Sequence, residues 1–348
     1  MRVAFFTGLR KVEVCEVPEP RLIHADKVLL RIDRVGVCGS DVHYYASGKI
    51  GEQAVEFPAT IGHECSGTVV ETGAEVNQLR PGDRVAVDPA MVCGECDQCR
   101  TGRSNTCRHI QFMGTPGQAP GAVADYRVVP AENCLPIPES MTLDQAALIE
   151  PLSIGLYAVR LAGVGPAARV AILGCGPIGL SVLLSAKAVA SCSAYVTDLF
   201  DERLAAAARC GADWTGNPRR QDVVAEIARL EPDGLDWVFD CAGDPECVDQ
   251  ALRLLTPGGK LMLVGIPPSL HVPFHAHLMR TKEIAFQAVR RQRGCVGPAI
   301  ELVAGGQINT GELLTHRFPL DQIAEAFELV AGYRDGVIKA ILDLSGAR

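Results

Sequence analysis

The first part of the chain carries short runs of apolar and β-branched residues that end at proline or glycine turns, a pattern typical of strands. It predicts four strands, at Val12–Val17, Lys27–Val35, Glu64–Glu71 and Arg84–Pro89. Helical periodicity begins near residue 143, directly after Thr142, a residue type that caps helices. After this β-rich beginning we expect one helix over Leu143–Ala162.

From about residue 168 short apolar strands alternate with helical stretches. The predicted strands are Arg169–Leu173, Ala194–Thr197, Trp237–Asp240 and Lys260–Val264. The predicted helices are Ile178–Ala190, Glu202–Arg209, Val223–Leu230 and Pro245–Leu255. Such alternation implies right-handed crossovers and a parallel sheet with helices on both faces. The apolar strand near 260–266 is a candidate for an edge contact between two copies of the chain.

The C-terminal part adds a short mixed segment. Its pattern predicts a helix, a strand, a second helix and a final strand, at Val296–Val303, Glu312–Pro319, Leu320–Gly332 and Val337–Leu344. This tail is too short to form its own core, so we expect it to return to the first domain. We therefore predict an α/β domain over 151–290 and a β-rich domain made of 1–150 and 291–348.

Composition narrows the class of protein. The chain has 348 residues, enough for two separate cores, and 48% of them are hydrophobic, as in globular proteins. The formal net charge of −8 argues against binding of nucleic acid, which needs clustered Lys and Arg. Met1–Val14 contains charges and no apolar core, so we expect no signal peptide.

Two further features bear on location. Val170–Ala190 approaches the hydropathy of a membrane span, but glycines and a proline interrupt it and Lys187 lies near its end. A buried strand, turn and helix explains it better, so we predict no membrane partner. The 14 cysteines include isolated ones such as Cys15, Cys65 and Cys192, which do not form a disulfide framework. They indicate a reducing compartment, and we predict the cytoplasm.

Four cysteines lie close together in one short stretch. They are Cys93, Cys96, Cys99 and Cys107. Gaps of two residues let successive thiolates converge on one ion, and the longer last gap lets the loop close around it. Zn²⁺ favours four such sulfurs in sites that stabilise structure. Because all four positions would be filled by protein, a catalytic metal would need a second, open site.

A glycine-rich turn follows the first strand of the α/β part. Its sequence is Gly174-Cys175-Gly176-Pro177-Ile178-Gly179. Gly174 allows a tight turn, Gly176 lets the backbone approach a pyrophosphate, and Gly179 lets helix and strand come close together. The N-terminus of the following helix offers N–H groups and a partial positive charge to phosphates. The pattern predicts a dinucleotide site.

Asp198 stands at the end of the next strand and is the candidate for contact with the adenosine ribose. A carboxylate there accepts hydrogen bonds from the ribose hydroxyls and repels the additional phosphate of NADP. Arg203 is close by in sequence and offers a positive charge to that phosphate, unless it pairs with Asp198 or stacks on adenine. We predict NAD as the cofactor.

Candidates for an open metal site occur in the β-rich part. Cys38 and His63-Glu64 offer a thiol, an imidazole and a carboxylate, and Ser40, Asp41 and His43 follow Cys38 closely. Glu150 lies in an apolar run, where a charge is costly unless it is paired or bound to metal.

With these motifs in this order, the chain resembles the zinc-dependent medium-chain dehydrogenases, and among them the polyol (sorbitol/xylitol) dehydrogenases. The residues that carry the resemblance are Cys38–His43, Gly62–Glu64, the four cysteines, Ala147–Ser153 and the glycine-rich turn. The similarity runs over nearly the whole chain. It implies a Rossmann domain that binds NAD, over 151–290, and a GroES-like catalytic domain made of 1–150 and 291–348.

The resemblance also implies roles for single residues. Cys38 and His63 are expected to bind a catalytic zinc, with Glu64 at or next to the metal. Glu150 is expected to bind that zinc directly or through water, where alcohol dehydrogenases of the family often have a Cys. Together with the four-cysteine site, this gives two zinc ions per chain, one catalytic and one structural.

Three further residues resemble the family's proton path and its support. Ser40 resembles the hydroxyl that takes the proton of the alcohol, and His43 the next station towards solvent. Asp41 resembles the carboxylate that orients a ligand imidazole. Zinc would bind the substrate oxygen and favour the alkoxide, and hydride would pass to C4 of the nicotinamide, leaving a ketone. The two domains are expected to bring metal and cofactor together.

A polyol pocket needs polar side chains to pair several hydroxyls. Residues at positions that resemble its lining are Tyr44, Phe112, Thr115, Glu150 and Arg290. The family has a Tyr after this Arg, whereas this chain has Arg291, which leaves the polyol and its carbon open. Family members are commonly dimers or tetramers, so the resemblance implies a homo-oligomer.

Other classes fit less well. Threonine dehydrogenases share both metal motifs but tend to have a Thr at the place of Ser40 and an Asp at that of Glu150. Zinc-free quinone reductases lack both metal motifs. A zinc ribbon for nucleic acid or protein recognition conflicts with the acidic charge and the catalytic motifs. We predict oxidation of a secondary hydroxyl of a polyol to a ketose with NAD.

Overall fold

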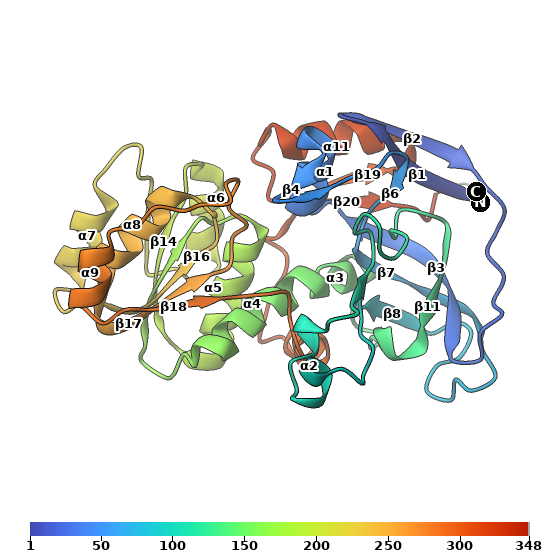
Figure 1. Cartoon of the computed structure of the whole chain (residues 1–348), viewed down its shortest axis with the longest axis horizontal. Helices are drawn as coiled ribbons and strands as arrows, with labels where there is room; N and C mark the ends of the chain where they lie inside the picture. Colours follow the sequence, from blue (N-terminus) through green and yellow to red (C-terminus); the bar gives the residue numbers. More distant parts are fainter. Residues whose placement is uncertain (347–348) are drawn as a thin grey trace. The chain divides into compact units, whose positions relative to one another are not determined.

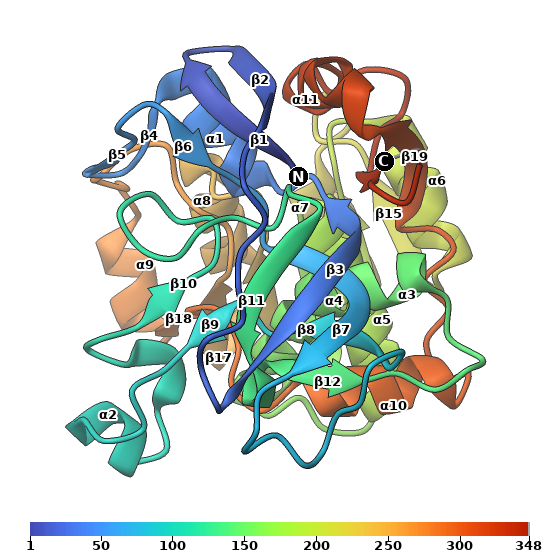
Figure 2. The same cartoon turned by 90° about the vertical axis from the view of Figure 1, so that its right-hand side faces the viewer.

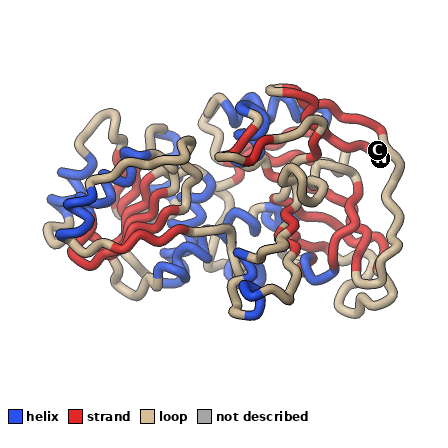
Figure 3. Tube along the Cα trace, in the orientation of Figure 1, coloured by secondary structure: helices blue, strands red, loops and turns tan. Residues whose placement is uncertain are grey.

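The structure, a computed structural model, describes residues 1–346 (Figures 1 and 3). The chain forms two compact units. The first unit comprises Met1–Glu150, Val296–Gly305 and the segment from Leu314 onward, and the second comprises Pro151–Cys295 and Gly306–Leu313. Most of the C-terminal tail thus belongs to the same unit as the beginning of the chain. The predicted roles of these units, catalysis and NAD binding, stay predictions.

The main sheet of the first unit has seven strands in the order β12-β8-β7-β3-β20-β19, with β11 also paired to β3 (Figure 2). Their bounds are β3 Lys27–Gly36, β7 Glu64–Thr72, β8 Arg84–Val87, β11 Tyr126–Pro130, β12 Cys134–Pro136, β19 Leu314–Pro319 and β20 Lys339–Asp343. Neighbouring strands are antiparallel except β19 and β20, which are parallel. The final strand pairs with β3, so the tail joins the first sheet, the arrangement that its short length led us to expect.

Smaller elements complete the first unit. Its short sheets use β1 Arg2–Gly8, β2 Lys11–Glu16, β4 Lys49–Ile50, β5 Gln53–Ala54, β6 Ala59–Thr60, β9 Ala90–Met91 and β10 Gln111–Phe112. Its helices are α1 Gly39–Ser47, α2 Asp97–Arg100, α3 Leu143–Ala147, α10 Val296–Ala304 and α11 Ile323–Ala331, with 3₁₀ turns η1 Ser104–Thr106, η2 Ala131–Asn133 and η3 Leu320–Gln322. The four predicted strands correspond to β2, β3, β7 and β8, with ends that differ by at most two residues.

A cluster of aromatic side chains connects α1 to α11 in the core of the first unit. The rings of Phe6, Tyr45 and Phe327 have centroids 5.1 to 5.5 Å apart. The Tyr45 hydroxyl donates to Glu328 Oε1 at 2.9 Å, and Arg10 pairs with the same carboxylate. Buried aromatic pairs contribute both apolar area and a preferred geometry. These contacts fix α1, whose first turn carries several of the predicted site residues.

The predicted helix Leu143–Ala162 is wrong in one respect, because the structure has two helices there. Thr142 caps α3 as expected: its hydroxyl accepts the N–H of Gln145, and the Gln145 side chain accepts the N–H of Thr142. This reciprocal pair is a capping box. The helix α3 ends at Ala147, with Leu148 as its C-cap, and α4 then runs over Ile149–Ala162, which places Glu150 in the first turn of α4. The periodicity continues across the break, so the sequence pattern does not reveal it.

The second unit contains the predicted parallel sheet, of six strands in the order β15-β14-β13-β16-β17-β18. Its strands are β13 Arg169–Leu173, β14 Ser193–Thr197, β15 Trp214–Gly216, β16 Leu235–Asp240, β17 Leu255–Leu263 and β18 Ala285–Ala288. Besides α4, its helices are α5 Pro177–Ala190, α6 Asp201–Arg209, α7 Val223–Leu230, α8 Pro245–Leu254 and α9 Ala276–Thr281. Every adjacent pair is parallel, and the strand order reverses direction at β13, as in doubly wound folds.

The prediction that the strand near 260–266 forms an edge contact is wrong. That segment belongs to β17, which is hydrogen-bonded on one side to β16 and on the other to β18. β18, which the pattern did not predict, ends the sheet instead. Val170–Ala190 forms most of β13 and all of α5, and no helix within residues 1–346 is long and apolar enough to cross a membrane.

Gly179 provides a test of the close contact between β13 and α5. A Cβ atom there would lie 2.0 Å from the carbonyl oxygen of Gly174, which is backbone and has little room to move. We expect Gly179→Ala to lower the free energy of unfolding by about 1–3 kcal/mol, measured by urea denaturation. Gly165→Ala is the control, because no atom lies within 4 Å of its added Cβ and its φ is not left-handed. Equal effects of the two changes would contradict this account.

Candidate metal centres and cofactor site

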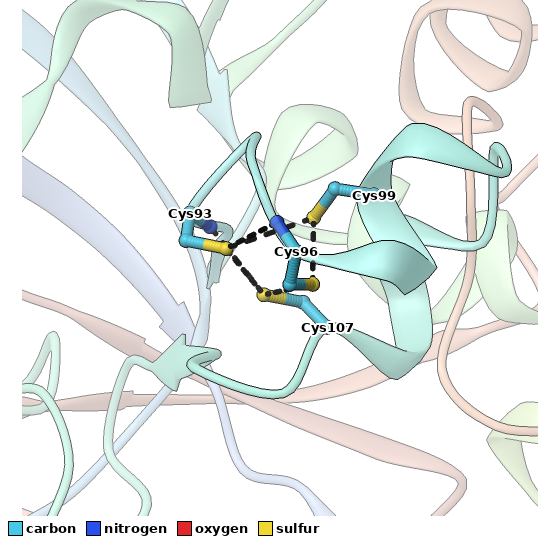
Figure 4. A group of neighbouring side chains, drawn as sticks. All are labelled: Cys93, Cys96, Cys99 and Cys107. Atoms are coloured by element: carbon cyan, nitrogen blue, oxygen red, sulfur yellow. Dashed lines mark hydrogen bonds between the residues drawn. The ribbon is translucent and has the colours of Figure 1, made fainter.

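The four predicted cysteines converge in the loop between β9 and β10 (Figure 4). Their Sγ atoms are 3.5 Å apart for Cys93–Cys107, 3.6 Å for Cys96–Cys99, 3.9 Å for Cys96–Cys107 and 4.0 Å for Cys93–Cys99. Four sulfurs at a Zn–S distance of ~2.3 Å lie about 3.8 Å from one another in a tetrahedron. The cluster therefore fits a four-coordinate zinc.

Backbone N–H groups favour the thiolate form of Cys96 and Cys107 in this cluster, whereas burial raises the pKa of Cys99 to about 12. The N–H groups of Arg108 and Cys99 lower the pKa of Cys96 to about 6. The N–H group of Cys96 also donates to Cys93 Sγ at 3.4 Å, and that of His109 to Cys107 Sγ at 3.4 Å. Zinc binds thiolate rather than thiol, so these donors favour the ligand form.

A second group of donors forms at the start of α1 and β7. Cys38 is the N-cap residue of α1, and Glu64 is the first residue of β7, directly after His63. One ligand atom from each of these three residues lies within 4.8 Å of the other two. His63 and Glu64 are buried, and Cys38 is half-buried. A thiol, an imidazole and a carboxylate suit zinc, and three protein ligands leave one position open.

Asp41 lies beside the imidazole of this group. Its Oδ1 atom lies 3.5 Å from His63 Nδ1, which leaves Nε2 as the atom suited to a metal. Burial alone would lower the pKa of His63, but Asp41 and Cys38 outweigh it and raise the pKa well above its usual value. The Asp41 Oδ2 atom is buried and has no hydrogen-bond partner within the described part of the chain. A neighbouring cation would compensate this concentration of negative charge.

Two of the other predicted catalytic and pocket residues, Ser40 and Phe112, contact this group. The Ser40 hydroxyl donates to Cys38 Sγ at 3.3 Å. The Phe112 ring lies 5.3 Å from the His63 ring, centroid to centroid. His43 is exposed on α1, one position before the buried Tyr44. Their predicted roles, and that of the half-buried Thr115, stay predictions.

Glu150 is not one of the three donors that converge. It lies in the first turn of α4 and is 6% exposed. Burial raises the pKa of Glu150 to about 7, with Glu64 adding to the rise and His63 and Lys339 opposing it. These interactions place Glu150 near the three donors without making it part of them. Arg290, the last predicted pocket residue, belongs to the second unit and is exposed.

Sequence reasoning missed two residues beside the three donors. Lys339 of β20 bonds to both carboxylate oxygens of Glu64, and Gly36 of β3 leaves the space that Glu64 occupies. The sequence contains a signal for Lys339, because a charged residue in the apolar run Val337–Leu344 must be paired if it is buried. Nothing comparable points to Gly36.

The glycine-rich turn has the geometry expected for a dinucleotide. Gly174 has φ +90°, and a Cβ there would lie 2.9 Å from the N and Cβ atoms of Ala242. Gly176 is the N-cap of α5, and Pro177 is its first residue, a position that needs no N–H donor. The N-terminus of α5 thus has no side chain at Gly176 to obstruct a phosphate group.

Asp198 follows β14 and lies beside this turn. Its Oδ2 atom accepts the N–H of Cys175 at 2.6 Å, and its Oδ1 atom accepts the N–H of Phe200 at 2.9 Å. Each carboxylate oxygen has two lone pairs, so both keep capacity for a ribose hydroxyl. The Arg203 guanidinium lies 3.8 Å from Asp198 Oδ2 and 5.1 Å from the centre of the Phe200 ring. Arg203 therefore interacts with Asp198, one of the alternatives that its sequence position left open.

Comparison with known proteins agrees with this arrangement. Residues 24–139 match the alcohol dehydrogenase GroES-like domain, and residues 177–305 match the zinc-binding dehydrogenase domain. The chain belongs to the zinc-dependent medium-chain dehydrogenases. A sorbitol dehydrogenase of Bacillus subtilis (strain 168) is 36% identical over 343 residues, which is 98% of this chain and 97% of that protein.

Solved structures of this dehydrogenase family have the same fold. A protein of Sinorhizobium meliloti 1021 bound to NADP has a TM-score of 0.88 at 31% identity, with 98% of each chain covered. An alcohol dehydrogenase (rspB) of Escherichia coli CFT073 in complex with NADH has a TM-score of 0.89 at 28% identity, with 99% of each chain covered. The predicted Rossmann and GroES-like folds are confirmed. The protein is an oxidoreductase of the zinc-dependent alcohol and polyol dehydrogenase family.

The four-cysteine cluster leads to a prediction about stability. Cys107→Ser should remove one zinc ion per chain and lower the thermal midpoint by roughly 5 °C or more, because a structural metal contributes folding free energy. Metal analysis and calorimetry measure both effects. Cys15→Ser is the control, since Cys15 is exposed on β2 and outside the cluster. Unchanged zinc content in Cys107→Ser would show that the cluster is not a metal site.

Proposed function

We propose that the protein oxidises a secondary hydroxyl of a polyol such as sorbitol or xylitol to a ketose, with NAD as the hydride acceptor. The observation that carries this proposal is the convergence of Cys38, His63 and Glu64 within 4.8 Å. The relative named sorbitol dehydrogenase supports the substrate class. The three residues would hold the catalytic zinc, and Glu150 would bind it directly or through water.

The chain's own residues prepare the substrate hydroxyl for this reaction. Zinc, when bound, supplies a Lewis acid that lowers the pKa of a coordinated hydroxyl. Asp41 keeps His63 in the tautomer that leaves Nε2 for the metal. Ser40, whose hydroxyl faces Cys38, would accept the substrate proton and pass it towards His43, which is exposed to solvent. Tyr44, Phe112, Thr115, Glu150 and Arg290 would contact the remaining hydroxyls.

The first unit would act as the catalytic domain and the second as the cofactor domain. The turn formed by Gly174, Gly176, Pro177, Ile178 and Gly179 would hold the pyrophosphate. Asp198 supports NAD rather than NADP, because its carboxylate would repel a 2′-phosphate, while Arg203 is engaged by Asp198 and Phe200. A cytoplasmic homo-oligomer, dimeric or tetrameric, remains our expectation.

A substrate panel tests this function. The protein should reduce NAD with xylitol, sorbitol or galactitol and not with threonine, as followed by absorbance of the reduced nicotinamide. Cys38→Ser should abolish turnover and reduce the zinc content from two ions per chain to one. NAD binding, measured by calorimetry, should stay unchanged, because the cofactor residues belong to the second unit. Oxidation of threonine without oxidation of any polyol would overturn the proposed substrate. Activity of a metal-free Cys38→Ser protein would overturn the proposed role of zinc.

A second experiment tests the cofactor preference. Asp198→Ala should weaken NAD binding and reduce the ratio of kcat/KM for NAD over NADP, by roughly 10-fold. The loss of a charge-assisted hydrogen bond to the ribose of NAD and the loss of repulsion of the 2′-phosphate of NADP both lower this ratio. Asp201→Ala is the control, a neighbouring and equally charged residue in the first turn of α6. An unchanged ratio in Asp198→Ala would remove Asp198 from the cofactor site.

A further inference from the structure

Lys339 brings an ammonium group into the interior of the first unit, beside one of the three metal donors. Its Nζ atom lies 2.7 Å from each carboxylate oxygen of Glu64 and donates to the Val37 carbonyl oxygen at 3.2 Å. Lys339 is 2% exposed and Glu64 is 1% exposed. The two opposite charges therefore depend on each other rather than on bulk water.

Three neighbouring strands create this contact. In the order β7-β3-β20, Gly36 of β3 stands opposite Glu64 of β7, and Lys339 begins β20. The lysine side chain thus spans the middle strand to reach the glutamate. A Cβ atom at Gly36 would lie 2.2 Å from Glu64 Oε2, so a larger residue at this position would displace the carboxylate.

The same carboxylate faces the metal donors. A carboxylate oxygen of Glu64 lies within 4.8 Å of the ligand atoms of Cys38 and His63, while both oxygens are at 2.7 Å from Lys339 Nζ. A metal can therefore bind Glu64 only by sharing it with the ammonium group or by displacing that group. In either case a positive charge close to the centre opposes the binding of a divalent cation.

Stability alone does not explain such a pair. Removing two charges from water costs free energy that their attraction seldom exceeds, and apolar replacements of buried ion pairs are often as stable or more stable. Lys339 also interacts electrostatically with Cys38 and Glu150, so its charge acts on Cys38 as well as on Glu64. These observations indicate that Lys339 affects how tightly the centre binds a metal ion.

We propose that Lys339 is a positioning residue that competes with the metal for Glu64 and so weakens metal binding at the Cys38–His63–Glu64 centre. The proposal rests on the proposed function, in which this centre holds the catalytic zinc. Without the metal, Lys339 keeps Glu64 paired inside the sheet. With the metal, it limits how strongly Glu64 contributes as a ligand.

The test measures zinc affinity rather than turnover. Purified zinc-loaded Lys339→Met is titrated with a competing chelator, and Cys38→Ser identifies which zinc signal belongs to this centre. We expect the dissociation constant of that zinc to fall by about 10-fold or more relative to the unchanged protein, the scale on which residues that contact metal ligands act. The zinc of the four-cysteine cluster should be unaffected. Lys11→Met, which removes a lysine exposed on β2, controls for net charge.

A double-mutant cycle separates competition for Glu64 from a general effect of charge. In a Glu64→Gln background the carboxylate is gone, so adding Lys339→Met should change zinc affinity much less than it does alone. Lys339→Gln keeps a donor to Glu64 without the charge and should fall between the unchanged protein and Lys339→Met. An equal effect of Lys339→Met in both backgrounds would show that Lys339 does not act through Glu64.

The outcomes distinguish this proposal from the proposed function. If Lys339→Met leaves the zinc dissociation constant unchanged or raises it, Lys339 is only a structural partner and the proposal is overturned. A Lys339→Met protein that folds only with zinc supports the proposal, because Glu64 would then depend on the metal for a partner; one that unfolds even with zinc contradicts it. If instead Cys38→Ser keeps all its zinc, the proposed function itself fails.

Discussion

A buried charge has to be compensated by the residues around it, and this requirement organises the end of the first unit that carries Cys38, His63 and Glu64. Cys38, Asp41, Glu64 and Glu150 bring several acidic groups into a region with little access to water. Lys339 compensates Glu64, and the environment favours a protonated His63 when no metal is present. A divalent cation would supply the remaining positive charge. The centre is therefore arranged so that metal binding removes an electrostatic cost that folding leaves in place.

Strand register decides which residues share this environment. Glu64 and Gly36 are opposite each other because β7 and β3 pair antiparallel, and Lys339 joins them because the last strand pairs with β3 from the other side. Lys339 and Glu64 are 275 residues apart in sequence. A shift of one residue in any of these pairings would turn the side chains to the other face of the sheet. The Cys38–His63–Glu64 centre thus depends on the whole sheet rather than on one motif.

The difference between local motifs and long-range strand pairing explains how much could be predicted from the sequence. Most of the parallel strands and helices of the second unit were predicted, because each is a local run with its own periodicity and each connection is short. The short strand β15 and the short helix α9 were not predicted. The family motifs located Cys38, His63 and Glu64. The break at Leu148 was missed, since apolar spacing continues through it, and β18 was missed because most of its residues are exposed. Lys339 and Gly36 could not be placed, because only long-range pairing brings them to Glu64.

The two candidate metal centres also differ in when they can form. All four cysteines of the cluster lie within residues 93–107, so a metal closes only a short loop there and needs little of the remaining fold. The other centre takes Cys38 from the start of a helix and His63 and Glu64 from the start of a strand, and its charge balance needs the C-terminal strand. Its donors can converge with Lys339 in place only after β20 has paired with β3. Metal binding at the cysteine cluster can therefore precede assembly of the sheet, whereas the Cys38–His63–Glu64 centre reaches its full charge balance only when the sheet is complete.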